Sequence, residues 1–464
     1  MKITIIGAGP GGYEAAIYAA KKGAEVTVVE KDKVGGTCLN KGCIPTKSLL
    51  ATSEALINMK AYEKLAISGI GEPKADFAGV IERKNKVVKN LVNGIEYLFK
   101  DNNVTLVKGT GRLLDAKTVE VLKDDGTAEK LSTDYIILAA GSAPLCPAFL
   151  GVDKKRVITS DEILDLKEAP GSLIIVGGGV IGCEIGQFMS KMGTQVTIVE
   201  ALPRIMATMD EDASKQLVRQ FKKDKIKVLT GDGIAKVSPA DDHVDVTLAS
   251  GKSLSADYCL AAIGRRCMTE GLGLENAGIR TDEKGRVITD EYLRTDAENI
   301  YTIGDLLPSV QLAHVASKEG FIAIDNIFGE NKKADYSAVP VCVFTTPQIA
   351  GVGKLEWELQ KEGKEKDRDY RTGTFDFKSL GKAQAGGHIA GFVKVIADMD
   401  DVIIGAEIAG EGAGDMLQTL TLAVQLKLTC SQVSECIFPH PSMCEAVLEA
   451  VHDVHGMSVN KISG

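Results

Sequence analysis

The sequence predicts an α/β fold with two dinucleotide-binding domains and a further α/β domain at its C-terminal end. The same pattern occurs twice: a strand rich in β-branched residues, then a glycine-rich turn, then a helix. Each copy ends on an acidic residue 18 residues after its last turn glycine, the arrangement of a Rossmann-like domain. After about residue 338 the pattern changes to alternating strands, which predicts the third domain.

The first copy begins almost at the first residue. Residues 2–6 predict a strand, residues 13–22 a helix and residues 24–29 a second strand that ends on Glu30. The turn between the first strand and the helix carries three spaced glycines, Gly7, Gly9 and Gly12. The first allows the tight turn, the second lets the backbone approach a pyrophosphate, and the third allows close helix packing. An acid at the position of Glu30 is expected to bind the ribose hydroxyls of the nucleotide.

The second copy repeats this pattern. Residues 172–176 predict its first strand, and residues 195–199 predict the strand that ends on Glu200. The turn glycines are Gly177, Gly179 and Gly182. A single glycine fingerprint is weak, because a generic glycine turn looks the same. Two copies in full strand–helix–strand context favour two dinucleotide sites, and two sites suggest two cofactors that exchange electrons.

An acid at the second site favours NAD over NADP. Glu200 should accept hydrogen bonds from ribose hydroxyls and repel a 2′-phosphate. Arg204 lies close enough in the sequence to leave NADP as the alternative.

Bulk properties set limits on the class of protein. A chain of 464 residues predicts two to four domains, since a single hydrophobic core stops growing below this size. The net charge of −9 argues against nucleic acid as a partner, and no apolar run approaches the length of a membrane span. The first strand begins almost at the first residue, and Lys2 is the only early basic residue, so we expect a soluble, cytoplasmic protein without a leader peptide.

One cysteine pair stands out among the ten cysteines. Cys38 and Cys43 are closely spaced and flanked by glycines, whereas most of the others lie in apolar stretches. Their spacing corresponds to about one and a third helical turns, so a bridge is possible where the helix distorts. In a reducing compartment such a pair is more often catalytic or metal-binding than structural. A zinc site is disfavoured, because no second pair of ligands follows at a suitable distance, and no other metal site is expected.

The run around these cysteines resembles the redox motif of the pyridine nucleotide-disulfide oxidoreductases, and within that family the branch that oxidises dihydrolipoamide. It reads Gly35-Gly-Thr-Cys38-Leu-Asn-Lys-Gly-Cys43-Ile-Pro-Thr-Lys47. The resemblance extends along the chain through Leu138-Ala-Ala-Gly-Ser142, Ala262-Ile-Gly-Arg-Arg266, Tyr301-Thr-Ile-Gly-Asp305 and His440-Pro-Ser-Met-Cys-Glu445.

The resemblance implies a domain order and an oligomeric state. Residues 1–145 would form the first part of an FAD-binding domain, 146–268 the NAD-binding domain, 269–337 the return segment of the FAD-binding domain, and 338–464 a dimerisation domain. The protein would be a homodimer.

The resemblance also implies roles for individual residues. Cys38 would exchange disulfides with the substrate, and Cys43 would pass electrons to the flavin. Lys47 and Glu184 would pair beside the reactive part of the flavin. Further FAD contacts would come from Thr37, Lys47, Gly111, Asp305 and Ala313, and backbone contacts to NAD from Val237 and Gly264.

His440 is the candidate base for the substrate thiols, because a carboxylate at Glu445 can orient its other ring nitrogen and stabilise the imidazolium. Pro441 predicts a helix over residues 442–455, with Glu445 in its first turns. In the family this histidine reaches the cysteines of the partner chain. Two positions depart from the pattern, since Phe438 and Cys444 replace a histidine and a serine.

The function that the resemblance implies is NAD-linked oxidation of protein-bound dihydrolipoamide through FAD. The partner would be a lipoylated carrier protein, either the acyltransferase of a 2-oxoacid dehydrogenase or the carrier of the glycine cleavage system. Two alternatives stay open: reduction of another disulfide such as glutathione with NAD(P)H, and a flavoprotein subunit that serves mainly to dock a multienzyme complex.

Overall fold

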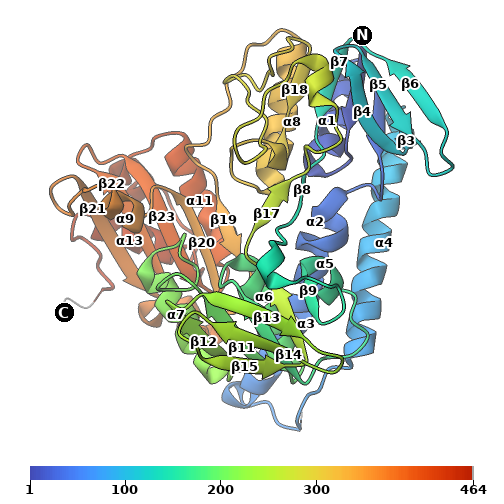
Figure 1. Ribbon diagram of the computed structural model, residues 1–464. Coiled ribbons are helices and arrows are strands. Elements are labelled where there is room, and N and C mark those ends of the chain that lie inside the picture. Colours follow the sequence, from blue (N-terminus) through green and yellow to red (C-terminus); the bar gives the residue numbers. More distant parts are fainter. Residues whose placement is uncertain (70, 462–464) are drawn as a thin grey trace.

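The computed structural model describes residues 1–69 and 71–461, so residues 462–464 of the expected dimerisation segment lie outside it. Three parts are visible in Figure 1: an upper lobe that holds the N-terminus, a lower lobe, and a C-terminal part beside them. The long helix α4 (Phe77–Asp101) runs along both lobes. The short helix α2 (Gly36–Lys41) lies between the lobes and leads into α3 (Cys43–Ala61).

The upper lobe is built on a parallel sheet with the strand order β18-β7-β1-β2-β3. The strands are β1 (Lys2–Ile6), β2 (Glu25–Glu30), β3 (Thr105–Lys108), β7 (Tyr135–Leu138) and β18 (Ile300–Thr302). Because β18 follows the whole lower lobe in the chain, the chain returns to this sheet after crossing to the other lobe. Helices α1 (Pro10–Lys21) and α8 (Ala313–Ile327) pack side by side in this lobe (Figure 1).

The lower lobe repeats the arrangement with the parallel order β12-β11-β10-β16-β9. Its strands are β9 (Val157–Thr159), β10 (Ser172–Val176), β11 (Gln195–Glu200), β12 (Lys227–Thr230) and β16 (Tyr258–Ala261). Its helices are α5 (Ser160–Ile163), α6 (Val180–Lys191) and α7 (Glu211–Lys223). The two Rossmann-like units predicted from the glycine patterns are confirmed.

Each unit also carries a three-stranded antiparallel sheet. The upper one contains β4 (Thr110–Asp115), β5 (Thr118–Leu122) and β6 (Ala128–Ser132), and the lower one β13 (Ile234–Pro239), β14 (Val244–Leu248) and β15 (Ser253–Ala256). The crossovers between the lobes pair as a two-stranded ribbon of β8 (Ser142–Pro144) and β17 (Arg265–Cys267).

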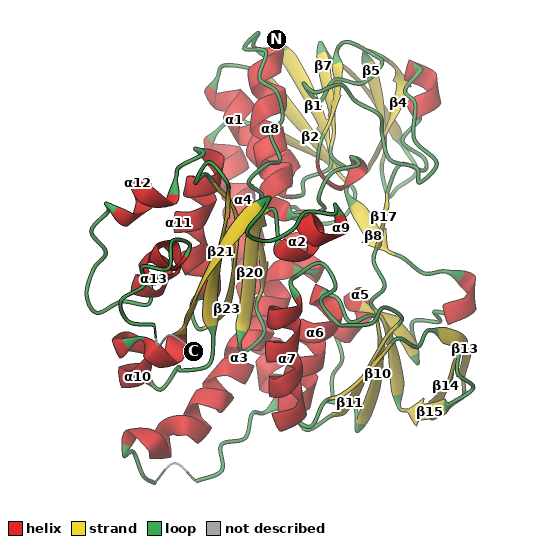
Figure 2. Ribbon diagram, turned by 90° about the vertical axis from the view of Figure 1, so that its left-hand side faces the viewer, coloured by secondary structure: helices red, strands yellow, loops and turns green. Residues whose placement is uncertain are grey.

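The C-terminal part is an antiparallel sheet with helices packed on it, as Figure 2 shows. Its strands are β19 (Val341–Val343), β20 (Gln348–Gly353), β21 (Tyr370–Asp376), β22 (Phe392–Asp398) and β23 (Ile403–Gly410). Its helices are α9 (Glu356–Lys361), α10 (Gly381–Gly386), α11 (Ala413–Gln425), α12 (Cys430–Ser434) and α13 (Glu445–Asp453). The strand that was expected over residues 388–396 begins four residues later, at Phe392. The residue before it, Gly391, has φ 152° and ends the preceding loop.

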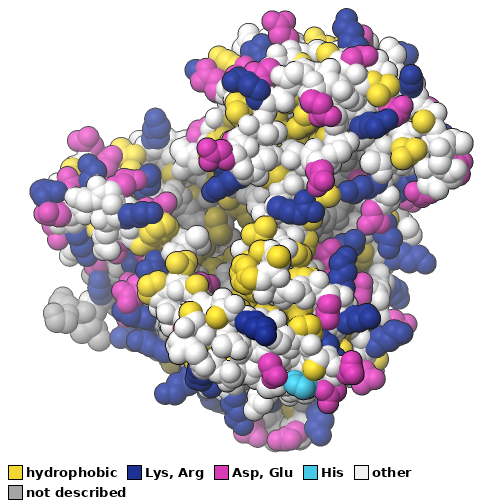
Figure 3. Space-filling model, in the orientation of Figure 1, with side chains coloured by type: hydrophobic (Ala, Val, Ile, Leu, Met, Phe, Trp, Pro, Cys, Tyr) yellow, Lys and Arg dark blue, Asp and Glu magenta, His cyan; other side chains and the backbone are white. Residues whose placement is uncertain are grey.

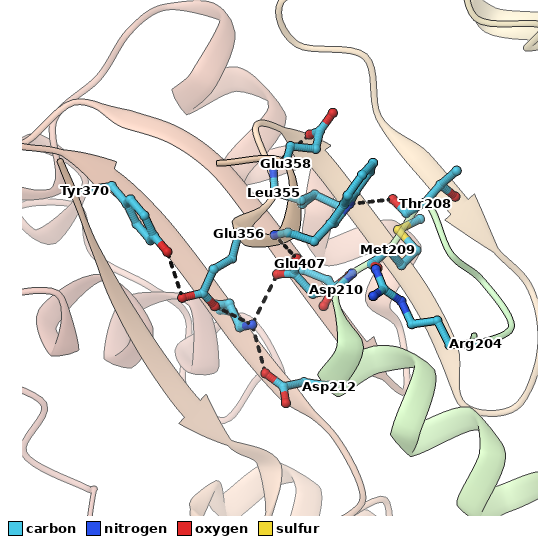
Figure 4. Close-up of polar contacts among 12 residues, drawn as sticks. Arg204, Thr208, Met209, Asp210, Asp212, Leu355, Glu356, Glu358, Tyr370 and Glu407 are labelled. Carbon is cyan, nitrogen blue, oxygen red and sulfur yellow. Dashed lines mark hydrogen bonds and ion pairs between the residues drawn. The ribbon is translucent and has the colours of Figure 1, made fainter. Parts of the chain in front are cut away.

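The lower lobe docks on the C-terminal sheet through apolar side chains and a buried group of charges. One hydrophobic cluster joins residues of both parts, among them Met209, Ile349 and Phe392. Beside it, the Lys394 ammonium lies 3.2 Å from Asp210, 2.9 Å from Asp212 and 3.0 Å from Glu356 (Figure 4).

None of the helices in the described part of the chain combines the length and the apolar character that a bilayer span requires.

Candidate active site

The two cysteines lie at the junction of α2 and α3, between the lobes. Cys38 is in α2, and Cys43 is the first residue of α3. The two cysteines do not share one continuous helix, because Gly42, at φ −146° and ψ −110°, separates α2 from α3. A Cβ atom at Gly42 would lie 3.1 Å from the Thr37 carbonyl oxygen. Glycine therefore permits the sharp break that brings the two thiols together.

The two thiols have different electrostatic surroundings. A hydrogen bond from the Cys38 thiol, aided by the Lys47 cation, lowers the pKa of Cys43 to about 7 although burial opposes this shift. The pKa of Cys38 is raised, first by that hydrogen bond and then by burial. Cys43 is therefore the first of the two thiols to ionise, while Cys38 keeps its proton. The thiolate is the reactive form of a cysteine.

Lys47 and Glu184 join α3 to the lower lobe. The Lys47 ammonium lies 2.7 Å and 3.0 Å from the two Glu184 carboxylate oxygens, and the Glu184 side chain is only 3% exposed. The Phe344 amide donates to the same carboxylate at 2.8 Å, and its ring lies 4.7 Å from the Lys47 nitrogen. Sequence reasoning missed Phe344, since it belongs to no motif and approaches from the C-terminal part.

His440 and Glu445 form a close pair. The His440 Nδ1 atom lies 2.8 Å from one Glu445 oxygen, and the Ser442 amide donates to the other at 2.9 Å. The expected helix over residues 442–455 is shorter, because α13 begins only at Glu445, whose carboxylate closes the turn before it. Burial opposes the shift, but the hydrogen bonds from the Ser442 amide and from His440 lower the pKa of Glu445.

His440 lies on an exposed tip. Its side chain is 78% exposed, and neighbouring Ile437 is 99% exposed. Within residues 1–69 and 71–461, His440 makes no hydrogen bond or ion pair with Cys38 or Cys43. The same chain therefore does not supply this base to its own cysteines in the described geometry.

The upper unit forms a cradle around its glycine turn. Gly7, at φ 108°, makes the turn, and a Cβ atom at Gly12 would lie 2.0 Å from the Gly7 carbonyl oxygen. The Glu30 carboxylate accepts hydrogen bonds from the Ala8 amide at 2.7 Å and the Asp32 amide at 2.8 Å. A cavity of about 110 Å³ opens beside it and is lined by residues that include Gly7, Glu30 and Gly111. A Cβ atom at Gly9 would have only Gly36 Cα nearby, at 4.0 Å, which leaves room for a phosphate.

Asp305 and Ala313 lie where the chain returns to the upper lobe. Asp305 follows β18, and its carboxylate accepts a hydrogen bond from Ser142. Arg265 donates to the Ser142 hydroxyl at 2.7 Å, so Ser142 and Arg265 belong to this polar group although neither was assigned a role from the sequence. Ala313 is the first residue of α8, and the first amides of a helix are available to bind an anion. Thr37 is a half-buried residue of α2.

The lower unit holds its acid in the same way. Gly177 has φ 110°, and a Cβ atom at Gly182 would lie 2.0 Å from the Gly177 carbonyl oxygen. The Glu200 carboxylate accepts from the Gly178 amide at 2.7 Å and the Leu202 amide at 2.8 Å. A Cβ atom at Gly179 would meet nothing within 4 Å in the described structure.

Two further expected NAD residues flank this unit. Val237 is buried on β13, and Gly264 follows β16 with φ 126°.

Arg204 is engaged away from the nucleotide cradle. Its guanidinium donates to the Ala207 carbonyl at 3.1 Å and the Met209 carbonyl at 2.8 Å. In Figure 4 its side chain extends toward Met209 and the buried charges. This removes the structural basis for reading Arg204 as a ligand of a 2′-phosphate.

The two departures from the family pattern are both packed on the C-terminal core. Phe438 and Cys444 are half-buried against the hydrophobic cluster inside the C-terminal part, and burial raises the pKa of the Cys444 thiol. Cys444 is therefore a packing residue in this fold.

The front face of the molecule is hollowed between the lobes, with apolar side chains gathered along the hollow (Figure 3). The roles given to the residues above stay predictions, but their positions are compatible with them: two nucleotide cradles flank one dithiol.

Comparison with known proteins identifies the family. The model of the pyridine nucleotide-disulphide oxidoreductases matches residues 1–320, and the model of their dimerisation domain matches residues 339–451. The chain is 38% identical to dihydrolipoyl dehydrogenase of Geobacillus stearothermophilus, over 99% of this chain and 97% of that one. It is 37% identical to dihydrolipoyl dehydrogenase of Bacillus subtilis, over 99% and 98% of the two chains.

Solved structures share the fold. LpdA from Mycobacterium tuberculosis superposes with a TM-score of 0.90 at 26% identity, over 97% of this chain and 99% of that one. The HOCl-induced flavoprotein disulfide reductase RclA from Escherichia coli superposes with a TM-score of 0.86 at 28% identity, over 97% and 99%.

Proposed function

Since the chain belongs to the pyridine nucleotide-disulphide oxidoreductase family, we propose that it is a dihydrolipoyl dehydrogenase that oxidises protein-bound dihydrolipoamide and reduces NAD. Its cofactors are FAD, in the upper unit, and NAD, in the lower unit. The observation that carries the proposal is the dithiol of Cys38 and Cys43 between two nucleotide cradles. FAD, when bound, carries the electron pair from this dithiol to NAD.

The residues of the chain divide the thiol chemistry among them. A thiolate of the substrate attacks the Cys38 sulfur of the Cys38–Cys43 disulfide and displaces Cys43, whose low pKa makes it a good leaving thiolate. The second substrate thiol then attacks the substrate sulfur of the mixed disulfide, which forms the lipoamide disulfide and displaces Cys38 as a thiolate. His440 accepts the substrate proton, and Glu445 orients the ring and stabilises its positive charge. Lys47, held by Glu184, keeps a positive charge beside the reaction.

A dimerisation domain is present, which supports a homodimer. We place His440 against the cysteines of the partner chain, because it is exposed and makes no contact with its own. The partner that supplies the substrate would be a lipoylated carrier of a 2-oxoacid dehydrogenase or of the glycine cleavage system, in the cytoplasm.

The experiment compares two substrate pairs in the FAD-loaded enzyme. We expect NAD reduction by dihydrolipoamide to be fast and NADPH oxidation by glutathione disulfide to be negligible, since Glu200 occupies the ribose position and Arg204 is engaged elsewhere. Cys38→Ser should abolish the first activity, whereas Cys436→Ser, an exposed cysteine outside the site, should retain it. Faster turnover of glutathione disulfide would refute the assignment of the substrate, and no turnover of either pair would favour a docking subunit.

A further inference from the structure

Three potential metal ligands meet in the C-terminal part, outside the residues that the redox chemistry uses. Asp401 lies in the turn between β22 and β23, Cys430 is the first residue of α12, and His455 follows the end of α13. One carboxylate oxygen, the thiol sulfur and one ring nitrogen all lie within 4.8 Å of one another. We propose that these three residues bind a divalent transition metal, with zinc(II) as the preferred ion.

The donor set fits zinc rather than a hard cation. Thiolate, imidazole and carboxylate are the three protein ligands that zinc takes, whereas magnesium and calcium take oxygen ligands almost exclusively. The Cys430 side chain is fully buried, while the His455 side chain is 36% exposed. The site thus has a closed side that holds the sulfur and an open side where water completes the coordination.

The Asp401 carboxylate is already oriented for one ligand bond. Its Oδ2 atom accepts hydrogen bonds from the Ser431 amide at 3.0 Å and the Ser431 hydroxyl at 2.7 Å. Its Oδ1 atom lies 2.8 Å from His455 Nε2, an ion pair that a bound ion would replace. Outer hydrogen bonds of this kind fix ligating carboxylates in metal sites and leave the other oxygen for the ion.

The distances require only small movements. In a tetrahedral site with bonds of about 2.0–2.3 Å, neighbouring ligand atoms stand about 3.4–3.7 Å apart. His455 and Asp401 would therefore separate by roughly half an ångström, and the sulfur would approach them by at most about 1.1–1.4 Å. The His455 ring is the mobile partner, because it is the exposed member of the set.

Metal binding would tie three segments that are distant in the sequence. It would join the β22–β23 turn, the start of α12 and the end of α13, whose first residue is Glu445. Because the ion binds the folded arrangement, it would raise the stability of the domain that carries the His440–Glu445 pair.

The test measures zinc bound by the FAD-loaded dimer with the Cys38–Cys43 disulfide closed, so that the redox dithiol does not compete. After equilibrium dialysis we expect one zinc per chain, a sulfur atom in its coordination shell by X-ray absorption, and a melting temperature that rises with zinc concentration. Because binding releases the thiol proton, the affinity should rise by about tenfold per pH unit below the pKa of the thiol.

Variants separate this site from unspecific binding. Cys430→Ser and His455→Gln should each weaken zinc binding by about tenfold or more. Two nearby controls, Cys436→Ser just after α12 and His452→Gln within α13, should not. His455 is exposed, so its variant should fold even where a change at buried Cys430 does not. The proposal is overturned when the oxidised wild type binds no zinc, when sulfur is absent from the shell, or when His455→Gln binds as tightly as His452→Gln.

Discussion

The two nucleotide-binding units hold their acids alike but are supported differently. Glu30 and Glu200 each accept two backbone amides at 2.7 and 2.8 Å. In the upper unit, α1 meets α8 at backbone distance, since a Cβ atom at Gly11 would lie 2.7 Å from the Ala316 carbonyl oxygen. The position that matches Gly11 in the lower unit is Ile181, and that unit docks on the C-terminal sheet through buried charges. The geometry of each nucleotide cradle thus follows from its own glycine motif, and the two units stabilise the same geometry with different packing.

Removal of the central cation should have the largest effect on the lower unit. Lys394→Met leaves Asp210, Asp212 and Glu356 without their shared partner, so we expect a loss of about 3–5 kcal/mol in the free energy of unfolding. Denaturant titration of the FAD-loaded enzyme measures this loss. The matched control is Lys354→Met, which breaks an exposed pair with Glu362 and should cost less than about 1 kcal/mol. Equal losses would show that the buried charges do not hold the lower unit in place.

A side chain at the α1–α8 contact should disturb the upper unit alone. Gly11→Val places atoms against the Ala316 backbone, which costs about 1–3 kcal/mol or more because backbone cannot move aside cheaply. We expect a lower content of FAD after purification and a lower melting temperature. Ile181→Val at the matching position should change stability by less than about 1.5 kcal/mol. Normal FAD content in Gly11→Val would mean that close helix packing is not needed.

Substitution of each acid should affect only its own cofactor. Glu200→Gln replaces one carboxylate oxygen by an NH₂ group, which cannot accept the hydrogen bond from the Gly178 or Leu202 amide. KM for NAD should therefore rise by about tenfold, which corresponds to about 1.4 kcal/mol, while the FAD content stays normal. Glu30→Gln should instead release FAD. Steady-state kinetics and flavin absorbance separate the two results. A rise in KM without loss of FAD in Glu30→Gln would contradict the assignment of the units.

The last comparison concerns pH. Burial and the negative charge of Asp210 raise the pKa of Glu407 to about 8, and the Asp210 amide donates to this carboxyl at 2.8 Å. A raised carboxyl pKa means that the folded state binds the proton more tightly than the unfolded state, so stability falls as pH rises from about 4.5 to about 8. Glu407→Gln removes this dependence, and its melting temperature should exceed that of the wild type at pH 9 but match it near pH 5. A constant difference across this range would show that Glu407 does not titrate there.

Local sequence patterns predicted the strands and turns of the two nucleotide-binding units reliably. Residues 2–6 and 172–176 were predicted as strands and are β1 and β10, because β-branched runs followed by glycine turns determine their own conformation. The Lys47–Glu184 pair lies 137 residues apart in the sequence, and only the resemblance to a family, not any local pattern, suggested it.

What depends on distant contacts was not predictable. The Lys394–Asp210 pair spans 184 residues and the Asp210–Glu407 contact 197, so no short window of the sequence contains both partners.

The start of α13 was placed too early because the Glu445 side chain, rather than helical hydrogen bonds, satisfies the Ser442 amide. Arg204 was left as a possible phosphate ligand because its carbonyl partners are visible only in the folded chain.

The exposed position of His440 has a genetic consequence. If each catalytic unit takes its cysteines from one chain and its base from the other, a chain without Cys38 and a chain without His440 are defective for different halves of the same site. A mixed dimer of the two has one site with both parts intact and one with neither. Two alleles that are inactive alone would therefore complement each other when expressed together, and two alleles defective in the same half would not.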